Sequence, residues 1–192
     1  MRIFGIDPGS VRTGYGCVET DGRRFRLVAS GAIISPAADP FPQRLARIHR
    51  ELAAQLIACR PDAVAIESLF YATNVRTALT LGHARGVAML AAVEVGCPVA
   101  EYTPAEIKRA VVGYGRAEKH QVQQMIKLLL GLAEPPSSND AADALAVAIC
   151  HLHSMPRTGL TAGLREHSAR SGRPAKGRVE AKSWRQYRPQ TN

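Results

Sequence analysis

The sequence has few aromatic residues, scattered cysteines and no long apolar run. Phe, Trp and Tyr make up 5% of its 192 residues, and none of the four cysteines forms a Cys-x-x-Cys pair. This spacing argues against a zinc site or a disulfide framework. The longest uncharged apolar run, residues 87–93, is far shorter than the ~20 residues that a membrane-spanning helix needs. Asp7 interrupts the N-terminus too early for a signal peptide, so we expect a cytoplasmic protein with reduced thiols and no membrane contact.

Acidic residues are scarce relative to basic ones, and the imbalance is concentrated near the C-terminus. The chain has 16 Asp and Glu against 25 Lys and Arg, a net charge of +9, and residues 157–192 hold nine of the basic residues but only two acids. Large apolar side chains nearly vanish in that segment, so it cannot bury enough surface to offset its ordering entropy. We predict a folded domain over 1–156, a basic disordered tail over 157–192, and a polyanionic partner. Trp184 and Tyr187 in the tail could stack on bases or on a partner protein, or the tail could serve only for solubility.

The spacing of apolar residues predicts the order of the secondary structure. Three antiparallel strands over 2–7, about 13–20 and about 25–34 come first, with a two-residue hairpin signal at Asp21-Gly22. The remaining elements are expected to be a helix over 41–60, a strand over 63–67, a helix over 74–95, a strand over 97–102 and helices over 104–112, 118–131 and 138–153. This order predicts an α/β fold in which βαβ units extend a mixed sheet and helices cover both faces.

Two acidic residues end apolar strands. Asp7 closes the first strand directly before a Pro-Gly turn, and Glu67 closes the strand over 63–67. A buried carboxylate is costly unless it is paired or bound to a cation. Because Asp is also a common turn former before Pro-Gly, Asp7 alone does not establish a site.

Asp140 and Asp143 lie three residues apart at the start of the last predicted helix. Ser137-x-x-Asp140 fits a capping box, which gives Asp140 a structural alternative but does not explain Asp143. On a helix this spacing brings the Cβ atoms within roughly 5–6 Å. Carboxylates without clustered His or Cys favour magnesium or manganese over zinc, and two such ions can support phosphodiester hydrolysis.

Taken together, the motifs resemble the RuvC family of Holliday-junction resolvases. The resemblance covers about residues 1–155 and is carried by IFGIDPGSVRTGYG, AIESLFYATN, LGHARG, VVGYGRAEKHQV and SSNDAADALAVA. It implies a ribonuclease-H-like fold and a homodimer that makes paired, metal-dependent nicks in opposed strands of a four-way DNA junction during recombination and repair. It further implies Mg²⁺ as the cofactor, two ions per active site with Mn²⁺ as a substitute, and a junction branch-migration complex as a partner.

The same resemblance assigns roles to individual residues. The four metal-binding catalytic acids correspond to Asp7, Glu67, Asp140 and Asp143. The DNA contacts that the resemblance implies are Phe70, which would meet an unpaired base, Lys108 and Lys119. Tyr71 and Arg76 are further expected DNA contacts, Tyr71 because exposed aromatics after a strand end are costly unless they stack or pack. Lys119 is also expected to assist catalysis. A cation at a helix N-terminus is disfavoured unless an anion lies nearby, and a DNA phosphate would be such an anion.

The helix predicted over 74–95 is apolar on more faces than one sheet can cover. It contains Gly82-x-x-x-Gly86 followed by an uninterrupted apolar run. An internal helix could cover the additional surface, but we favour a two-fold dimer contact because paired nicks in a symmetric junction need two sites related by symmetry.

Three rival interpretations compete with the resolvase. The first is another ribonuclease-H-like nuclease, acting on RNA–DNA hybrids or as a monomer on other branched nucleic acids. The second is an actin-like phosphotransfer protein, which needs a duplicated domain and a second phosphate loop that 192 residues do not hold. The third is a non-catalytic junction-binding protein, in which four acids without metal ions would repel the DNA backbone.

Deletion of residues 157–192 is predicted to weaken general DNA binding and to flatten its salt dependence, because fewer counterions are released. Junction cleavage should persist in the shortened protein. Titrations of duplex and four-way DNA at several salt concentrations test this prediction, and loss of folding or of all cleavage would show that the domain boundary is misplaced.

Overall fold

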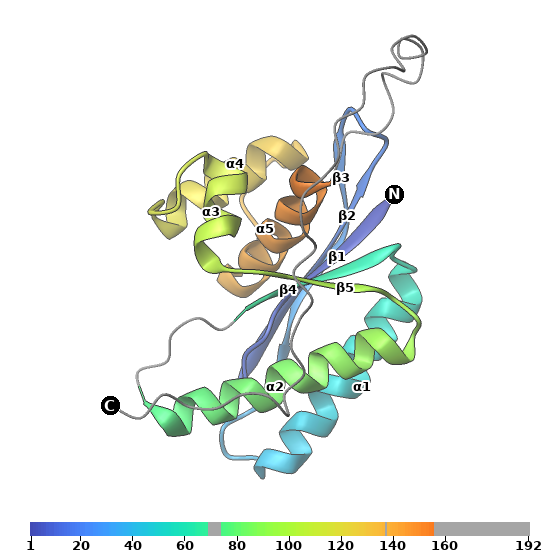
Figure 1. Ribbon diagram of the computed structural model, residues 1–192, viewed down its shortest axis with the longest axis vertical. Coiled ribbons are helices and arrows are strands. Elements are labelled where there is room, and N and C mark those ends of the chain that lie inside the picture. Colours follow the sequence, from blue (N-terminus) through green and yellow to red (C-terminus); the bar gives the residue numbers. More distant parts are fainter. Residues whose placement is uncertain (69–73, 137, 156–192) are drawn as a thin grey trace, which may run out of the picture. The chain divides into compact units, whose positions relative to one another are not determined.

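The computed structural model describes residues 1–68, 74–136 and 138–155, in which a five-stranded mixed sheet carries helices on both faces (Figure 1). The strands are β1 (Arg2–Asp7), β2 (Arg12–Thr20), β3 (Phe25–Ile34), β4 (Ala63–Glu67) and β5 (Val99–Tyr102). They lie in the order β3-β2-β1-β4-β5. The β3-β2-β1 part is antiparallel, whereas β1, β4 and β5 are parallel. The predicted fold class is therefore confirmed.

The helices follow the predicted order with bounds that differ by no more than one residue. They are α1 (Phe41–Cys59), α2 (Val75–Glu94), α3 (Pro104–Val112), α4 (Lys119–Leu130) and α5 (Asn139–Ser154). Several ends have recognisable caps. Asn74 caps α2 through its side chain, Thr103 forms a capping box with Glu106 at α3, and Gly131 ends α4 in the left-handed conformation.

The two faces of the sheet have separate apolar cores. Alternate side chains of a strand point to opposite faces, so Phe4 and Ile6 of β1 pack with α1 and α2, while Ile3 packs with α3, α4 and α5. Figure 1 shows the two helical layers on either side of the strands. Within the described part of the chain, no helix is both long enough and apolar enough to cross a membrane.

Helix α5 lies against the sheet through glycines, with backbone against backbone. A Cβ atom at Gly5 of β1 would overlap the Ala144 carbonyl oxygen and would lie 2.7 Å from the Ala148 nitrogen. A Cβ atom at Gly14 of β2 would lie 2.6 Å from the Asp140 carbonyl carbon. Glycine is therefore required at both positions, and the close approach fixes the start of α5 above β1 and β2.

The connection between β2 and β3 differs from its prediction. The prediction of a two-residue hairpin at Asp21-Gly22 is wrong, because β2 ends at Thr20 and β3 begins only at Phe25. Asp21 Oδ1 accepts hydrogen bonds from the Arg23 nitrogen at 2.8 Å and the Arg24 nitrogen at 2.9 Å, which stabilises a longer turn.

Strand β5 also begins later than predicted, at Val99 rather than at residue 97. The Cys97 nitrogen donates a hydrogen bond to the Ala92 carbonyl oxygen at the end of α2. Cys97 therefore belongs to the helix terminus and not to the strand.

Gly5→Ala is predicted to destabilise the protein by about 1–3 kcal/mol, because backbone atoms of α5 would have to move away from β1. Gly82→Ala is the matched control for packing within the single chain, since no described atom outside its own stretch of helix lies within 4 Å of its added Cβ. A helical alanine there should add up to about 1 kcal/mol of stability. Urea unfolding of both variants measures the difference, and an unchanged Gly5 variant would contradict the close approach of α5.

Candidate metal centre

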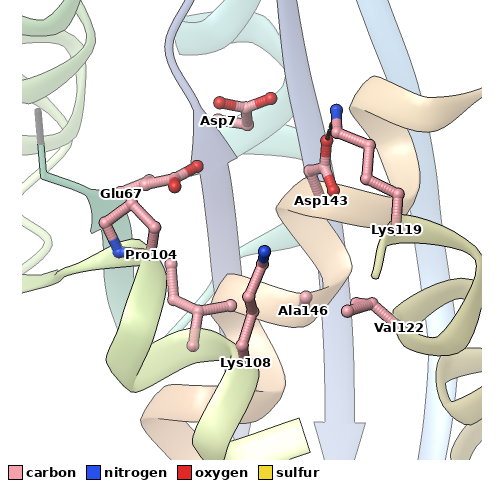
Figure 2. A pocket seen from close by; sticks show the side chains of 9 residues that line it. Asp7, Glu67, Pro104, Lys108, Lys119, Val122, Asp143 and Ala146 are labelled. Atoms are coloured by element: carbon pink, nitrogen blue, oxygen red, sulfur yellow. Dashed lines mark hydrogen bonds and ion pairs between the residues drawn. The ribbon is translucent and has the colours of Figure 1, made fainter. Parts of the chain in front are cut away.

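The parallel pairing of β1 and β4 brings two strand-end carboxylates side by side. Ile6 pairs with Ile66, so Asp7 and Glu67 follow at the same edge of the sheet. Both side chains are half-buried. Figure 2 shows the two carboxylates on neighbouring strand ends, facing a common space.

Helix α5 supplies the third carboxylate. Ser138 is its N-cap and accepts a hydrogen bond from the Ala141 nitrogen at 3.1 Å. The capping-box interpretation of Asp140 with Ser137 is therefore wrong, and Asp140 lies in the first turn of the helix. Asp143 follows one turn later and faces Asp7 and Glu67 across the same space (Figure 2).

These three acids line a cavity of about 300 Å³. Two lysines join them from α3 and α4, and apolar side chains close the wall. The lining residues are Asp7, Glu67, Asp143, Lys108, Lys119, Pro104, Ile107, Val122 and Ala146. Three of the four predicted acids and two of the predicted DNA contacts are thus brought together.

The acids repel one another in partly buried surroundings. Burial, followed by the charge of Asp143, raises the pKa of Asp7 to about 6. Burial, followed by the charge of Asp7, raises the pKa of Glu67 to about 8. Both shifts reflect first the removal of the carboxylates from water and then their mutual repulsion, which the charge of Lys119 offsets only in part.

The donor set fits a hard divalent cation. All the candidate ligands are carboxylate oxygens, which Mg²⁺ and Mn²⁺ prefer. A cation would offset both the burial and the repulsion that raise the two pKa values. Among the described residues, no three acidic, His or Cys side chains are already grouped closely enough to hold an ion. The carboxylates surround the cavity, and side-chain rotation is needed to bring them together.

Lys119 already offsets part of the negative charge. It is the first residue of α4, and its Nζ lies 3.3 Å from Asp143 Oδ2. The charge of Asp143 raises the pKa of Lys119. The carboxylate is therefore the anion that makes a lysine acceptable at this helix start. Lys108 extends toward the cavity from α3 (Figure 2).

Asp140 has a different environment from the other three acids. Its Oδ2 accepts a hydrogen bond from Arg12 Nε at 2.6 Å, and Asp140 is not among the described residues that line the cavity. The sequence patterns did not identify Arg12. Residues two apart on a strand share a face, so Arg12 lies on the same face of β2 as Gly14 and faces α5. The sequence alone does not reveal this, because it does not show that α5 crosses β2 at Gly14.

The turn after Asp7 is held by a second arginine that the sequence patterns did not reveal. Arg44 of α1 is buried, donates from Nε to the Ser10 carbonyl oxygen at 2.9 Å, and lies over the Phe41 ring. Thr13 Oγ1 donates to the Gly9 carbonyl oxygen at 2.7 Å. These bonds fix the backbone that carries Asp7 and Arg12.

The remaining predicted contacts are not part of the cavity as described. Arg76 is exposed near the start of α2. Phe70 and Tyr71, like Trp184 and Tyr187 in the tail, lie outside the described residues.

Comparison with known proteins gives consistent matches. The family model of crossover junction endodeoxyribonuclease RuvC matches residues 3–151, a span that includes all four acids. The crossover junction endodeoxyribonuclease RuvC of Syntrophomonas wolfei is 52% identical over 154 residues, which cover 80% of this chain and 90% of the relative. The protein of the same name from Geobacter sp. (strain M21) is 53% identical over 165 residues, covering 86% of this chain and all of the relative.

A solved structure matches over the same extent. The structure of Thermus thermophilus RuvC in complex with a Holliday junction substrate has a TM-score of 0.76 and 37% identity, with 80% of this chain and 93% of the other covered. A fold shared over nearly the whole of that protein agrees with the order of elements seen here.

Glu67→Gln is predicted to stabilise the metal-free protein, by more at about pH 8 than at about pH 5. The pKa of Glu67 is higher in the folded than in the unfolded chain, so the folded state binds more protons and loses stability as the pH rises between these values. One pKa unit corresponds to about 1.4 kcal/mol, and we expect a gain on the order of 1–2 kcal/mol at the higher pH.

Thermal unfolding in a chelating buffer at both pH values measures the gain. Magnesium should then stabilise the wild-type protein more than the variant, because the ion binds only where its carboxylates are intact. A stability difference that is the same at both pH values would contradict the raised pKa of Glu67.

Proposed function

Because the chain belongs to the RuvC family of crossover junction endodeoxyribonucleases, we propose that the cavity between β1, β4 and α5 is where it hydrolyses phosphodiester bonds of four-way DNA junctions. One observation carries this assignment. Asp7, Glu67 and Asp143 come from three elements far apart in the sequence and meet at one cavity with Lys108 and Lys119.

RuvC nucleases depend on a metal ion. We infer two Mg²⁺ ions per site, with Mn²⁺ as a substitute, held by Asp7, Glu67, Asp140 and Asp143. Metal ions at this position would activate the attacking water and stabilise the leaving oxygen. Support comes from the all-oxygen donor set and from the raised pKa values of Asp7 and Glu67, both of which favour occupation by a hard cation.

The lysines are proposed to hold the DNA backbone at the cavity. Lys108 and Lys119 are the cations that line it, and a phosphate entering the site would come within reach of both. Lys119 is also expected to act in catalysis, because once Asp143 turns to a metal ion its ammonium group is free for the scissile phosphate. Arg76, exposed on α2, would contact the DNA backbone further from the cavity.

Phe70 and Tyr71 are proposed as contacts to DNA bases. They follow Glu67 by three and four residues, so they come from the chain that leaves the metal site. A base stacked on an aromatic ring gains ~1–3 kcal/mol in a sequence-tolerant way. This suits recognition of an unpaired base near the crossover.

We further propose a homodimer that uses one face of α2. The alanines Ala84, Ala88, Ala91 and Ala92 of this helix are buried in the core shared with α1. Other apolar side chains of α2 are exposed, namely Val75, Leu79, Leu90 and Val93. A Cβ atom added at Gly82 or Gly86 would have no described atom within 4 Å. Two cleavage sites related by two-fold symmetry suit paired nicks in opposed strands.

The cellular setting is inferred from the family. The expected location is the cytoplasm, in keeping with four cysteines that form no disulfide. A junction branch-migration complex is the proposed protein partner, and residues 157–192 are proposed to be a basic tail outside the nuclease domain.

Asp7→Asn, Glu67→Gln and Asp143→Asn are each predicted to reduce magnesium-dependent nicking of a synthetic four-way junction by at least about 100-fold, because each removes a metal ligand. Junction binding in metal-free buffer should be retained or tightened, since each change removes a charge that repels phosphates. Glu19→Gln, at the far end of β2, is the matched control and should nick normally.

Asp140→Asn separates a metal ligand from a residue that only complements the dipole of α5. Loss of that dipole interaction and of the ion pair with Arg12 would by itself cost about 0.3–1 kcal/mol of stability and leave turnover intact at a permissive temperature. Near-normal nicking by this variant would reduce the site to three acids. Near-normal nicking by the Asp7 variant would refute the metal site as a whole.

A further inference from the structure

Arg12 is the cation nearest to Asp140, and it stands outside the cavity. Arg12 begins β2, and its Nε donates to Asp140 Oδ2 at 2.6 Å. The arginine side chain is 46% exposed and that of Asp140 is 25% exposed. The pair therefore lies at the rim of the molecule, where solvent and a bound polyanion can reach the guanidinium group.

The ion pair keeps Asp140 apart from the other acids. The backbone of Asp140 is fixed on Gly14 of the neighbouring strand, so only rotation of the side chain can change where its carboxylate lies. Lys119 holds Asp143 in a comparable pair at 3.3 Å, but Asp143 lines the cavity and Asp140 does not.

An approaching DNA phosphate would compete for Arg12. A guanidinium group binds phosphate as well as carboxylate, and its planar donors suit both. A partly exposed ion pair contributes little stability, so its exchange for a phosphate is inexpensive. In the proposed function, Lys108 and Lys119, which line the cavity, would bring the DNA backbone to this edge of the sheet.

We propose that Arg12 is a positioning residue that holds Asp140 away from the metal site in the free protein and transfers to a DNA phosphate when a junction binds. The released carboxylate then completes the metal site. This inference rests on the proposed function, because it requires both metal binding at the acids and DNA at the cavity. If Arg12 acts in this way, DNA binding strengthens metal binding and metal binding strengthens DNA binding, since coupling between sites is reciprocal.

The first test is a Mn²⁺ titration of the DNA-free protein, in which electron paramagnetic resonance measures the concentration of free Mn²⁺. Arg12→Ala should bind Mn²⁺ about two- to fivefold more tightly than wild type, the range expected for loss of a partly exposed ion pair. Arg26→Ala is the matched control, because Arg26 pairs with Glu19 at 3.9 Å near the opposite end of β2, and it should leave Mn²⁺ affinity unchanged.

A double-variant cycle separates release of Asp140 from a general charge effect. If Arg12 acts through Asp140, Arg12→Ala should change Mn²⁺ affinity little when Asp140→Asn is already present. If Arg12→Ala increased Mn²⁺ affinity equally in the presence of Asp140 and in the Asp140→Asn variant, the proposal would be overturned, because the arginine would then act only through its charge.

The second test measures junction binding in a chelating buffer at several salt concentrations. Arg12→Ala should weaken binding and lower the magnitude of the salt slope by about 1, as expected for one lost phosphate contact. Arg12→Lys should restore the slope. An unchanged slope in Arg12→Ala, or weaker Mn²⁺ binding together with a lower melting temperature, would show a purely structural role and overturn the proposal.

Asp7→Asn in the same Mn²⁺ titration distinguishes failure of the proposed metal site from failure of the proposed role of Arg12. Loss of Mn²⁺ binding in this variant places the ion at the acids, and the Arg12 result then stands or falls by itself. Unchanged Mn²⁺ binding in Asp7→Asn would remove the proposed metal site and the role of Arg12 with it.

Discussion

The close approach of α5 to β1 and β2 is the constraint on which the rest of the site depends. Gly5 and Gly14 leave no side chain between the helix backbone and the strands, so the helix start is fixed against Gly14 of β2, the residue that pairs with Asp7 of β1. From this position Asp143 faces Asp7 and Glu67 across the cavity, and Asp140 meets Arg12 at the rim. A larger residue at either glycine would lift the helix and move Asp143 away from Asp7 and Glu67, with which it lines the cavity. The precision of the site thus comes from backbone packing on rigid elements.

Repulsion among the acids is the second organising feature. Burial, followed by neighbouring charge, raises the pKa values of Asp7 and Glu67, so the domain carries an unfavourable interaction where β1 and β4 end. The protein offsets part of this with Lys119 on Asp143 and Arg12 on Asp140. In the proposed function, both cations also lie where DNA phosphates would arrive. On that proposal the same side chains would neutralise the acids before substrate binds and the substrate afterwards, and the acids would then be left to the metal ions.

The sequence predicted the fold well because its apolar periods are long and unambiguous. Strand ends at Asp7 and Glu67 were identified correctly, and parallel pairing then placed the two acids together. The errors lie where one polar side chain decides local geometry. Asp21 stabilises a turn longer than the two-residue hairpin, and Ser138 rather than its neighbour caps α5. The roles of Arg12 and Arg44 could not be predicted, because each depends on contacts between elements more than 30 residues apart in the chain.

The dispersal of the acids along the chain has a consequence for biosynthesis. Asp7 and Glu67 lie in the first half of the sequence, whereas Asp143 belongs to the last helix of the described fold. A ribosome extends a chain at about 5–20 residues per second, so the early strands are made several seconds before α5 can cover them. During that interval the growing chain has some of its acids but not the cavity that brings them together. If this cavity is the active site, as proposed, the endonuclease becomes competent only after nearly its entire folded domain has been made.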